Sequence, residues 1–214
     1  MANGTADSIA PYFTIWTEPR ATIRRIVELD PRRNVIVLAM LAPVLTTLEH
    51  QWMAVMSGSK TAPWWPYQVA LEVAGAALFG IVALYVNSGL VTWAGRAMGG
   101  VGRALEMRAA IAWSEIPTIT AAGASIIALL AGLMTPPAVG INGLPKMGES
   151  LIELGGVHFV LAIWGFVISV KCIGEVHRFS AWRALLAILI VAFFAAAILG
   201  LVILAAYLSP GRRE

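Results

Sequence analysis

The last apolar run of the sequence limits most strongly what this chain can fold into. The 25 residues from Ala184 to Leu208 carry no charged side chain. As a helix they would extend about 37 Å, which exceeds the roughly 30 Å hydrocarbon core of a bilayer. A second apolar run begins at Val157, and only the short basic segment Gly174–Ala184 separates the two. The pattern predicts a transmembrane hairpin whose turn faces the cytoplasm.

Composition supports a membrane protein and excludes other classes. Hydrophobic residues make up 59% of the 214 residues and charged residues 13%, about half the share that soluble domains carry. The net charge of +3 comes without a concentrated basic face interleaved with aromatic side chains, so we expect no nucleic-acid partner. The single cysteine, Cys172, excludes an internal disulfide. No cofactor-binding motif is present, and we expect no cofactor.

The apolar runs predict an all-α integral membrane protein with five spans. We expect a cytoplasmic tail and amphipathic helix over residues 1–33, a five-span membrane domain over 34–208, and a short extracytoplasmic tail over 209–214. A proline near the start of the third span predicts a separate interfacial segment before it, over Ala109–Ile116. The predicted spans are Asn34–Leu48, Tyr67–Trp93, Pro117–Met134, a fourth from Val157 to the basic turn, and Ala184–Leu208.

An amphipathic helix precedes the first span. Met1–Pro11 reads as a disordered tail; Thr17 can cap a helix with Pro19 in its first turn, and Asp30 ends it. Its apolar side chains form one stripe and its arginines cover the other side. Two interpretations stay open: the helix lies among anionic headgroups, or it packs on the cytoplasmic face of the bundle.

The distribution of Lys and Arg predicts the orientation. Eleven of these residues fall on the side of the N-terminal segment, the second loop and the turn before the fifth span, whereas four fall on the other side. Positively charged loops stay in the cytoplasm. We therefore expect a cytoplasmic N-terminus and, with five spans, an extracytoplasmic C-terminus.

Three motifs in this order resemble the Yip-domain family of multi-pass membrane proteins. EPRATIRRI (Glu18–Ile26) precedes the first span, GGVGRALEMRAAIAWSEIP (Gly99–Pro117) joins the second to the third, and WGFVISVKCIGEVHRFSAWRA (Trp164–Ala184) closes the fourth. The resemblance implies a five-span bundle with a cytoplasmic N-terminus. Eukaryotic members are associated with vesicle traffic, Rab-type GTPases and membrane shaping. The short tail here lacks the Asp-Leu-Tyr segment of those members and looks more like the short bacterial members, so we expect the bacterial inner membrane.

Four ionisable residues near the predicted cytoplasmic ends form a candidate polar cluster. In the functional interpretation, Glu115 and Glu175 face a cytoplasmic cavity with His177 as a titratable neighbour, which would suit transport or proton relay. In the structural interpretation, Lys171 pairs with Glu175 four residues on, and Glu115 caps the third span. The spacing favours the structural interpretation.

A weaker group gathers at the opposite ends of the spans. Nitrogen and oxygen ligands there could converge on a metal, although no HExxH or CxxC spacing is present. An interfacial position explains these residues more simply. The four residues are Glu49, His50, Glu72 and His158.

The cytoplasmic arginines suggest a surface for lipid phosphates or a protein partner. They are Arg20, Arg24, Arg25, Arg96, Arg103, Arg108, Arg178 and Arg183. No paired catalytic motif is apparent, so we expect no enzymatic activity. The sequence favours a Yip-like protein that organises membrane or recruits partners through this face. The alternative is a small transporter or channel that uses a cytoplasmic-side polar cavity.

Overall fold

The computed structural model describes residues 4–56, 63–133 and 146–208, and every regular element within these ranges is a helix. Five helical segments are long and apolar enough to cross a membrane, as predicted. Residues 57–62, between the first two predicted spans, and the predicted tail over 209–214 lie outside the described residues. The helices are α1 Gly4–Thr17, α2 Pro19–Leu29, α3 Val35–Met56, α4 Trp65–Ala97, α5 Ala104–Ser114, α6 Ile116–Leu133, α7 Lys146–His177 and α8 Ala181–Leu208.

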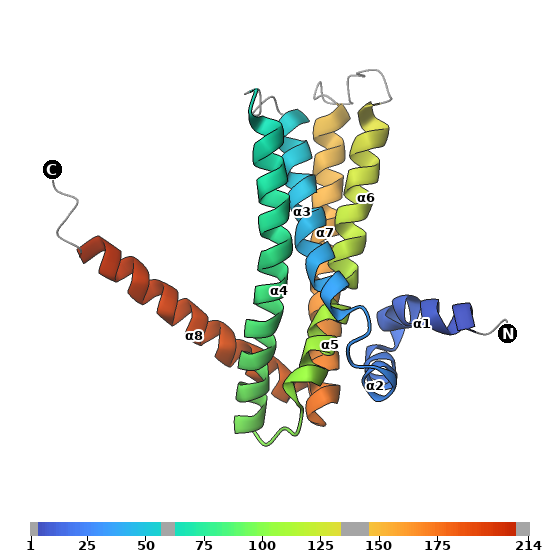
Figure 1. Cartoon of the computed structure of the whole chain (residues 1–214), viewed down its shortest axis with the longest axis vertical. Coiled ribbons are helices and arrows are strands. Elements are labelled where there is room, and N and C mark those ends of the chain that lie inside the picture. The colour runs from blue at the N-terminus through green and yellow to red at the C-terminus, as the bar shows by residue number, and fades with distance from the viewer. Residues whose placement is uncertain (1–3, 57–62, 134–145, 209–214) are drawn as a thin grey trace.

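Four long helices stand side by side in a bundle (Figure 1). α3 packs against α4 and α6, and α6 packs against α7, while α5 is wedged between α4 and α7 at one end. The α2–α3, α4–α5 and α7–α8 links all lie toward that end, which we call the basic end because α2, these links and the helix turns beside them carry most of the arginines. This arrangement agrees with the loop grouping that the charge pattern predicted.

The core lies at the basic end, around α5. Met107 and Trp113 are completely buried, together with Ile168 of α7 and Ile23 of α2. Further from the basic end, most large side chains on α4 and α8 are exposed, including Phe79 and Phe193. Exposed apolar side chains of this kind are stable when they face lipid rather than water.

The segment before the third span is a separate helix, as predicted, and it belongs to the core of the bundle. α5 begins at Ala104 instead of Ala109, and its alanines pack in the core of the bundle. Small side chains allow this, because they let neighbouring helices approach closely. α6 then starts at Ile116 with Pro117 as its second residue, where the missing N–H of proline costs no hydrogen bond.

The N-terminal region differs from the prediction. Gly4–Pro11 belong to α1 and are not a disordered tail, and Glu18, rather than Thr17, occupies the N-cap position of α2. α2 ends at Leu29 as expected. Its apolar stripe packs on α5 and α7, so the second interpretation of the amphipathic helix is the one the structure bears out.

The turn between α7 and α8 is tighter than predicted, since only Arg178–Ser180 separate the helices. The N–H of Phe179 donates to the carbonyl of Gly174 and that of Arg178 to the carbonyl of Glu175, with Arg178 at φ 56°. These two bonds form a Schellman motif, which satisfies the last carbonyls of a helix. Residues from Lys146 onward are already helical, so α7 begins earlier than the predicted Val157.

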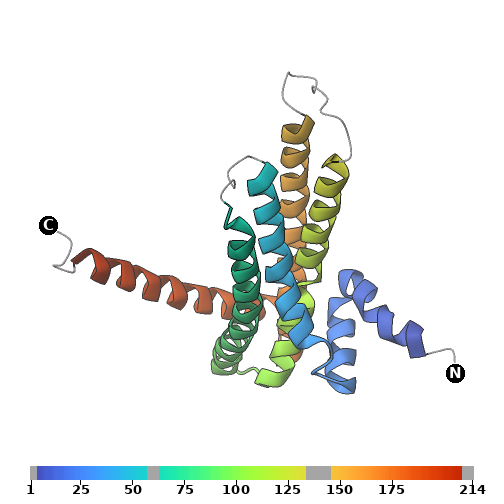
Figure 2. The same ribbon diagram turned by 45° about the horizontal axis from the view of Figure 1, so that its top comes forward.

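α8 has the predicted length but does not lie along the other spans. It leaves the basic end and slants away from the bundle, on the side opposite α1 and α2 (Figures 1 and 2). Ala184 and Ala187 are fully buried, whereas from Ala192 onward its described side chains are exposed. The fifth helix is therefore anchored only through its first turns.

Candidate functional site

Glu175 fastens α2 to the bundle. Its carboxylate accepts a hydrogen bond from Nε of Arg24 at 2.7 Å and forms a longer ion pair with Arg20 at 3.5 Å. The hydrogen bond to Glu175, and then its negative charge, raises the pKa of Arg24 above the ordinary value. The predicted partner, Lys171, makes no salt bridge with Glu175; its Nζ lies 5.9 Å from the ring centroid of Trp164. The arginines of α2 reach Glu175 because that helix packs against α7.

His177 is buried in a pocket made of glycines. A Cβ added to Gly95 would lie 2.2 Å from the imidazole, and one added to Gly100 would lie 2.5 Å from it. The N–H of Gly102 donates to Nδ1 at 3.2 Å, and Phe179 stacks on the ring. Because a backbone N–H can only donate, Nδ1 is the unprotonated nitrogen. The glycine-rich loop thus holds a histidine, a role that sequence analysis missed.

Glu115 lies in different surroundings from the other three members of the predicted cluster. It follows α5 and is the twelfth residue of the 25-residue candidate span Ala104–Ala128. Its side chain forms a hydrogen bond with Thr118 and lines a cavity of about 650 Å³ between α3, α4, α5 and α6. Lys171, Glu175 and His177 do not line this cavity.

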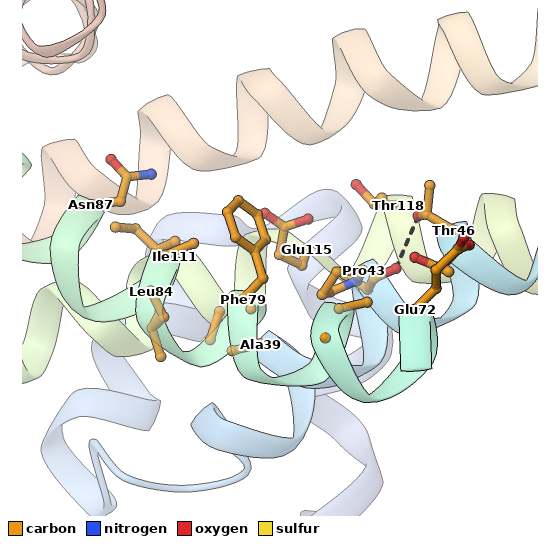
Figure 3. Close-up of a pocket in the computed structure, with 17 residues that line it drawn as sticks. Ala39, Pro43, Thr46, Glu72, Phe79, Leu84, Asn87, Ile111, Glu115 and Thr118 are labelled. Atoms are coloured by element: carbon orange, nitrogen blue, oxygen red, sulfur yellow. Dashed lines mark hydrogen bonds between the residues drawn. The ribbon is translucent and has the colours of Figure 1, made fainter. Parts of the chain in front are cut away.

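The cavity is apolar apart from a few polar groups spaced along it. Figure 3 shows Asn87, Glu115 and Thr118 along its length, with Glu72 and Thr46 at the far end. A second cavity of about 430 Å³ shares Asn87, Glu115 and Thr118 and extends to α7 and the first turns of α8. Asn87 falls within the predicted span Tyr67–Trp93, but the sequence does not show that it lines a cavity.

The four weak metal candidates are not brought together as ligands of one ion. His158 Nε2 lies 3.2 Å from the carboxylate of Glu49. The carboxylate of Glu72 instead accepts hydrogen bonds from the side-chain amides of Gln51 and Gln68. His50 is exposed. Within residues 4–56, 63–133 and 146–208, no three His, Cys, Asp or Glu side chains are placed to hold a metal ion. The helix ends converge on the same side, but their side chains point to different partners.

The predicted arginines divide into two groups. Arg20 and Arg24 contact Glu175, Arg96 donates to the carbonyl of Gly102, Arg103 pairs with Glu106, and Arg108 lies over the ring of Tyr85. These five are held by the protein itself. The other three have exposed side chains: Arg25 of α2, Arg178 of the α7–α8 turn and Arg183 of α8.

The fold and the apolar helix surfaces define a polytopic α-helical membrane protein, with a basic end and a polar-lined cavity. The chain matches the Yip1 domain over residues 13–204 and belongs to the Yip1 domain family, as its motifs indicated. Comparison with curated proteins and with solved structures gave no match.

Proposed function

We propose that this Yip1-family protein is a non-enzymatic membrane organiser that recruits a partner through its basic end. The observation that carries the proposal is that the exposed arginines lie on segments packed at one end of the bundle, where α2 packs on α7 and a short turn joins α7 to α8 (Figure 1). Guanidinium groups on a common surface suit acidic protein segments and lipid phosphates.

The docking of α2 supports a preformed surface. Glu175 and the buried side chain of Ile23 hold this helix against α7. Arg25 therefore projects from a helix with a fixed position, which lowers the ordering cost of binding. The positive charge on the loops of this end supports a cytoplasmic position, and we extend the proposal to a bacterial inner membrane with the N-terminus inside.

The test is a crosslinked pull-down of the full-length protein from native membranes at endogenous expression. The variant replaces Arg25, Arg178 and Arg183 with Glu, and the matched control replaces them with Lys. Arg20 and Arg24 are left unchanged because they hold α2 in place. We expect a stoichiometric cytoplasmic-side partner that is lost in the Glu variant and retained in the Lys variant.

Two results would overturn recruitment. One is recovery of the protein alone, or only with further copies of itself, from membranes that contain the wild-type chain. The other is a partner that the Glu variant still captures in full. Equal membrane insertion of the two variants, measured by alkaline extraction, ensures that the comparison concerns binding and not folding.

A further inference from the structure

The bundle has an open side between α4 and α7. In the described part of the chain, α4 packs on α3, and α7 packs on α6, but α4 and α7 do not pack along each other. α8 touches both helices only near its first turns and then slants away. Both cavities described above lie within this bundle, and the side chain of Phe79 at the rim is 68% exposed. We call this space the lateral groove.

Polar groups follow the lateral groove over most of a membrane thickness. Glu72 and Asn87 both line it and are fifteen residues apart on α4, which corresponds to about 22 Å of helix. Thr118 and Glu115 lie between them, and Thr46 lies at the same end as Glu72 (Figure 3). A hydrocarbon core is roughly 30 Å thick, so an occupant of the groove meets polar contacts well below the membrane surface.

The carboxylate of Glu115 is not paired with a positively charged side chain in the described part of the chain. Among the described residues, no Lys, Arg or His forms an ion pair with it. A carboxylate within a span is costly and marks a functional position by default. A ligand that brings its own positive charge would remove this cost, and a primary ammonium group can also donate hydrogen bonds to the carboxylate.

The surroundings of Glu115 favour a lipid over a soluble amine. The cavity walls are mostly alanine, glycine and other apolar residues, and exposed Phe79 borders its rim. An amphiphile can enter sideways from the bilayer and keep its acyl chains against such a surface, whereas a small soluble cation would lose its hydration without apolar compensation.

We propose that the lateral groove binds a phospholipid with a primary ammonium headgroup. The ammonium group contacts the carboxylate of Glu115, which also accepts from Thr118, and the Asn87 amide faces the neighbouring phosphate. The acyl chains leave through the opening between α4 and α7. This site is separate from the basic end, and it holds the headgroup at a depth between the two membrane surfaces.

The test measures lipid binding to the purified full-length protein by native mass spectrometry. Phosphatidylethanolamine, phosphatidylcholine and phosphatidylglycerol with identical acyl chains are compared. Glu115→Gln is the test variant, and Glu106→Gln is the control because Glu106 lies on α5, the helix that Glu115 follows, but pairs with Arg103 outside the cavity. We expect phosphatidylethanolamine to bind most tightly, and Glu115→Gln to weaken it at least ten-fold while Glu106→Gln changes it little.

Equal binding of the three lipids to the wild-type protein would overturn the proposal without any variant. Unchanged phosphatidylethanolamine binding to a folded Glu115→Gln protein would do the same. Phosphoethanolamine without acyl chains is added as a competitor; if it displaces the lipid at equal concentration, the ligand is a soluble amine and the lipid assignment fails. If Glu115→Gln does not fold, Asn87→Leu replaces it and is expected to weaken the same lipid.

Discussion

The Glu175 carboxylate of α7 and the Arg24 guanidinium of α2 meet at 2.7 Å, across 151 positions of sequence. This contact lies beside the only cysteine of the chain. The Sγ of Cys172 lies 3.7 Å from the carbonyl oxygen of Pro19, the first residue of α2, and the cysteine is completely buried. α2 thus covers Cys172, and the ion pair helps to keep it there.

Glu175→Gln should expose Cys172. Loss of the carboxylate charge weakens the attachment of α2 to α7, and transient opening of this helix uncovers the thiol. We expect maleimide to label Cys172 several-fold faster in the variant, measured by mass shift in intact membranes. Glu106→Gln removes a different ion pair, with Arg103, and should leave the rate unchanged. An equal rate in wild type and Glu175→Gln would show that the ion pair does not hold α2.

Gly95→Ala should destabilise the protein by about 1–3 kcal/mol, the usual cost of overpacking. The new Cβ would lie 2.2 Å from His177 Nε2, and the imidazole has little room to move because Gly100 and Gly102 enclose it. The loss is measured as thermal stability in detergent. In the His177→Ala background the same substitution should cost much less.

Gly123→Ala is the matched control for Gly95→Ala. Gly123 lies in α6, and nothing stands within 4 Å of an added Cβ. Alanine has the higher helix propensity, by up to about 1 kcal/mol, so this variant should be as stable as wild type or slightly more stable. If the two glycine variants behaved alike, the glycine pocket would have no special role.

Trp113→Phe should cost about 1–3 kcal/mol, because it removes a part-buried hydrogen bond to a backbone carbonyl and leaves unfilled space in the core. The indole Nε1 of Trp113 donates to the carbonyl of Arg33 at 3.1 Å, and the side chain is completely buried. Chemical or thermal unfolding in detergent gives the difference. Trp182→Phe serves for comparison, since Trp182 is 74% exposed, and should have little effect. No loss for Trp113→Phe would contradict the bond.

A reporter fused after Glu214 should read as extracytoplasmic, because five spans separate it from a cytoplasmic N-terminus. A fusion that ends at Ser180, before α8, should read as cytoplasmic. Alkaline phosphatase and green fluorescent protein fusions give opposite signals and check each other. A cytoplasmic signal from the full-length fusion would exclude α8 as a fifth span.

Much of the fold could be predicted because hydrophobicity along the chain is a local property. Uncharged runs identified five membrane-length helices, and Pro117 identified the start of α6. Helix ends were less accurate: α7 starts eleven residues before the predicted Val157, because polar residues at its start continue the helix without adding to an apolar run.

The candidate site was less predictable because its residues depend on partners from other helices. The spacing of Lys171 and Glu175 suggested an ion pair within α7, but arginines from α2 occupy the carboxylate. Glu115 does stand at the cap position before α6, where its carbonyl accepts the N–H of Ile119, but only the structure shows that its side chain lines a cavity. Gly100 and Gly102 belong to the predicted link between the second and third spans. The sequence does not show that His177 of α7 lies against them, so the imidazole pocket could not be predicted.

The sequence by itself determined that this chain is a helical membrane protein of the Yip1 domain family, with arginines concentrated in particular loops. The length of an apolar segment and the charge of a loop determine how each interacts with lipid or water. They can therefore be interpreted from the sequence without knowing which residues each segment contacts. Only the tertiary structure decided that Glu175 holds α2, that three glycines enclose His177, and that α8 leaves a groove beside Glu115. Those features come from side chains that meet across distant positions of the chain, where packing selects one partner among several with compatible chemistry.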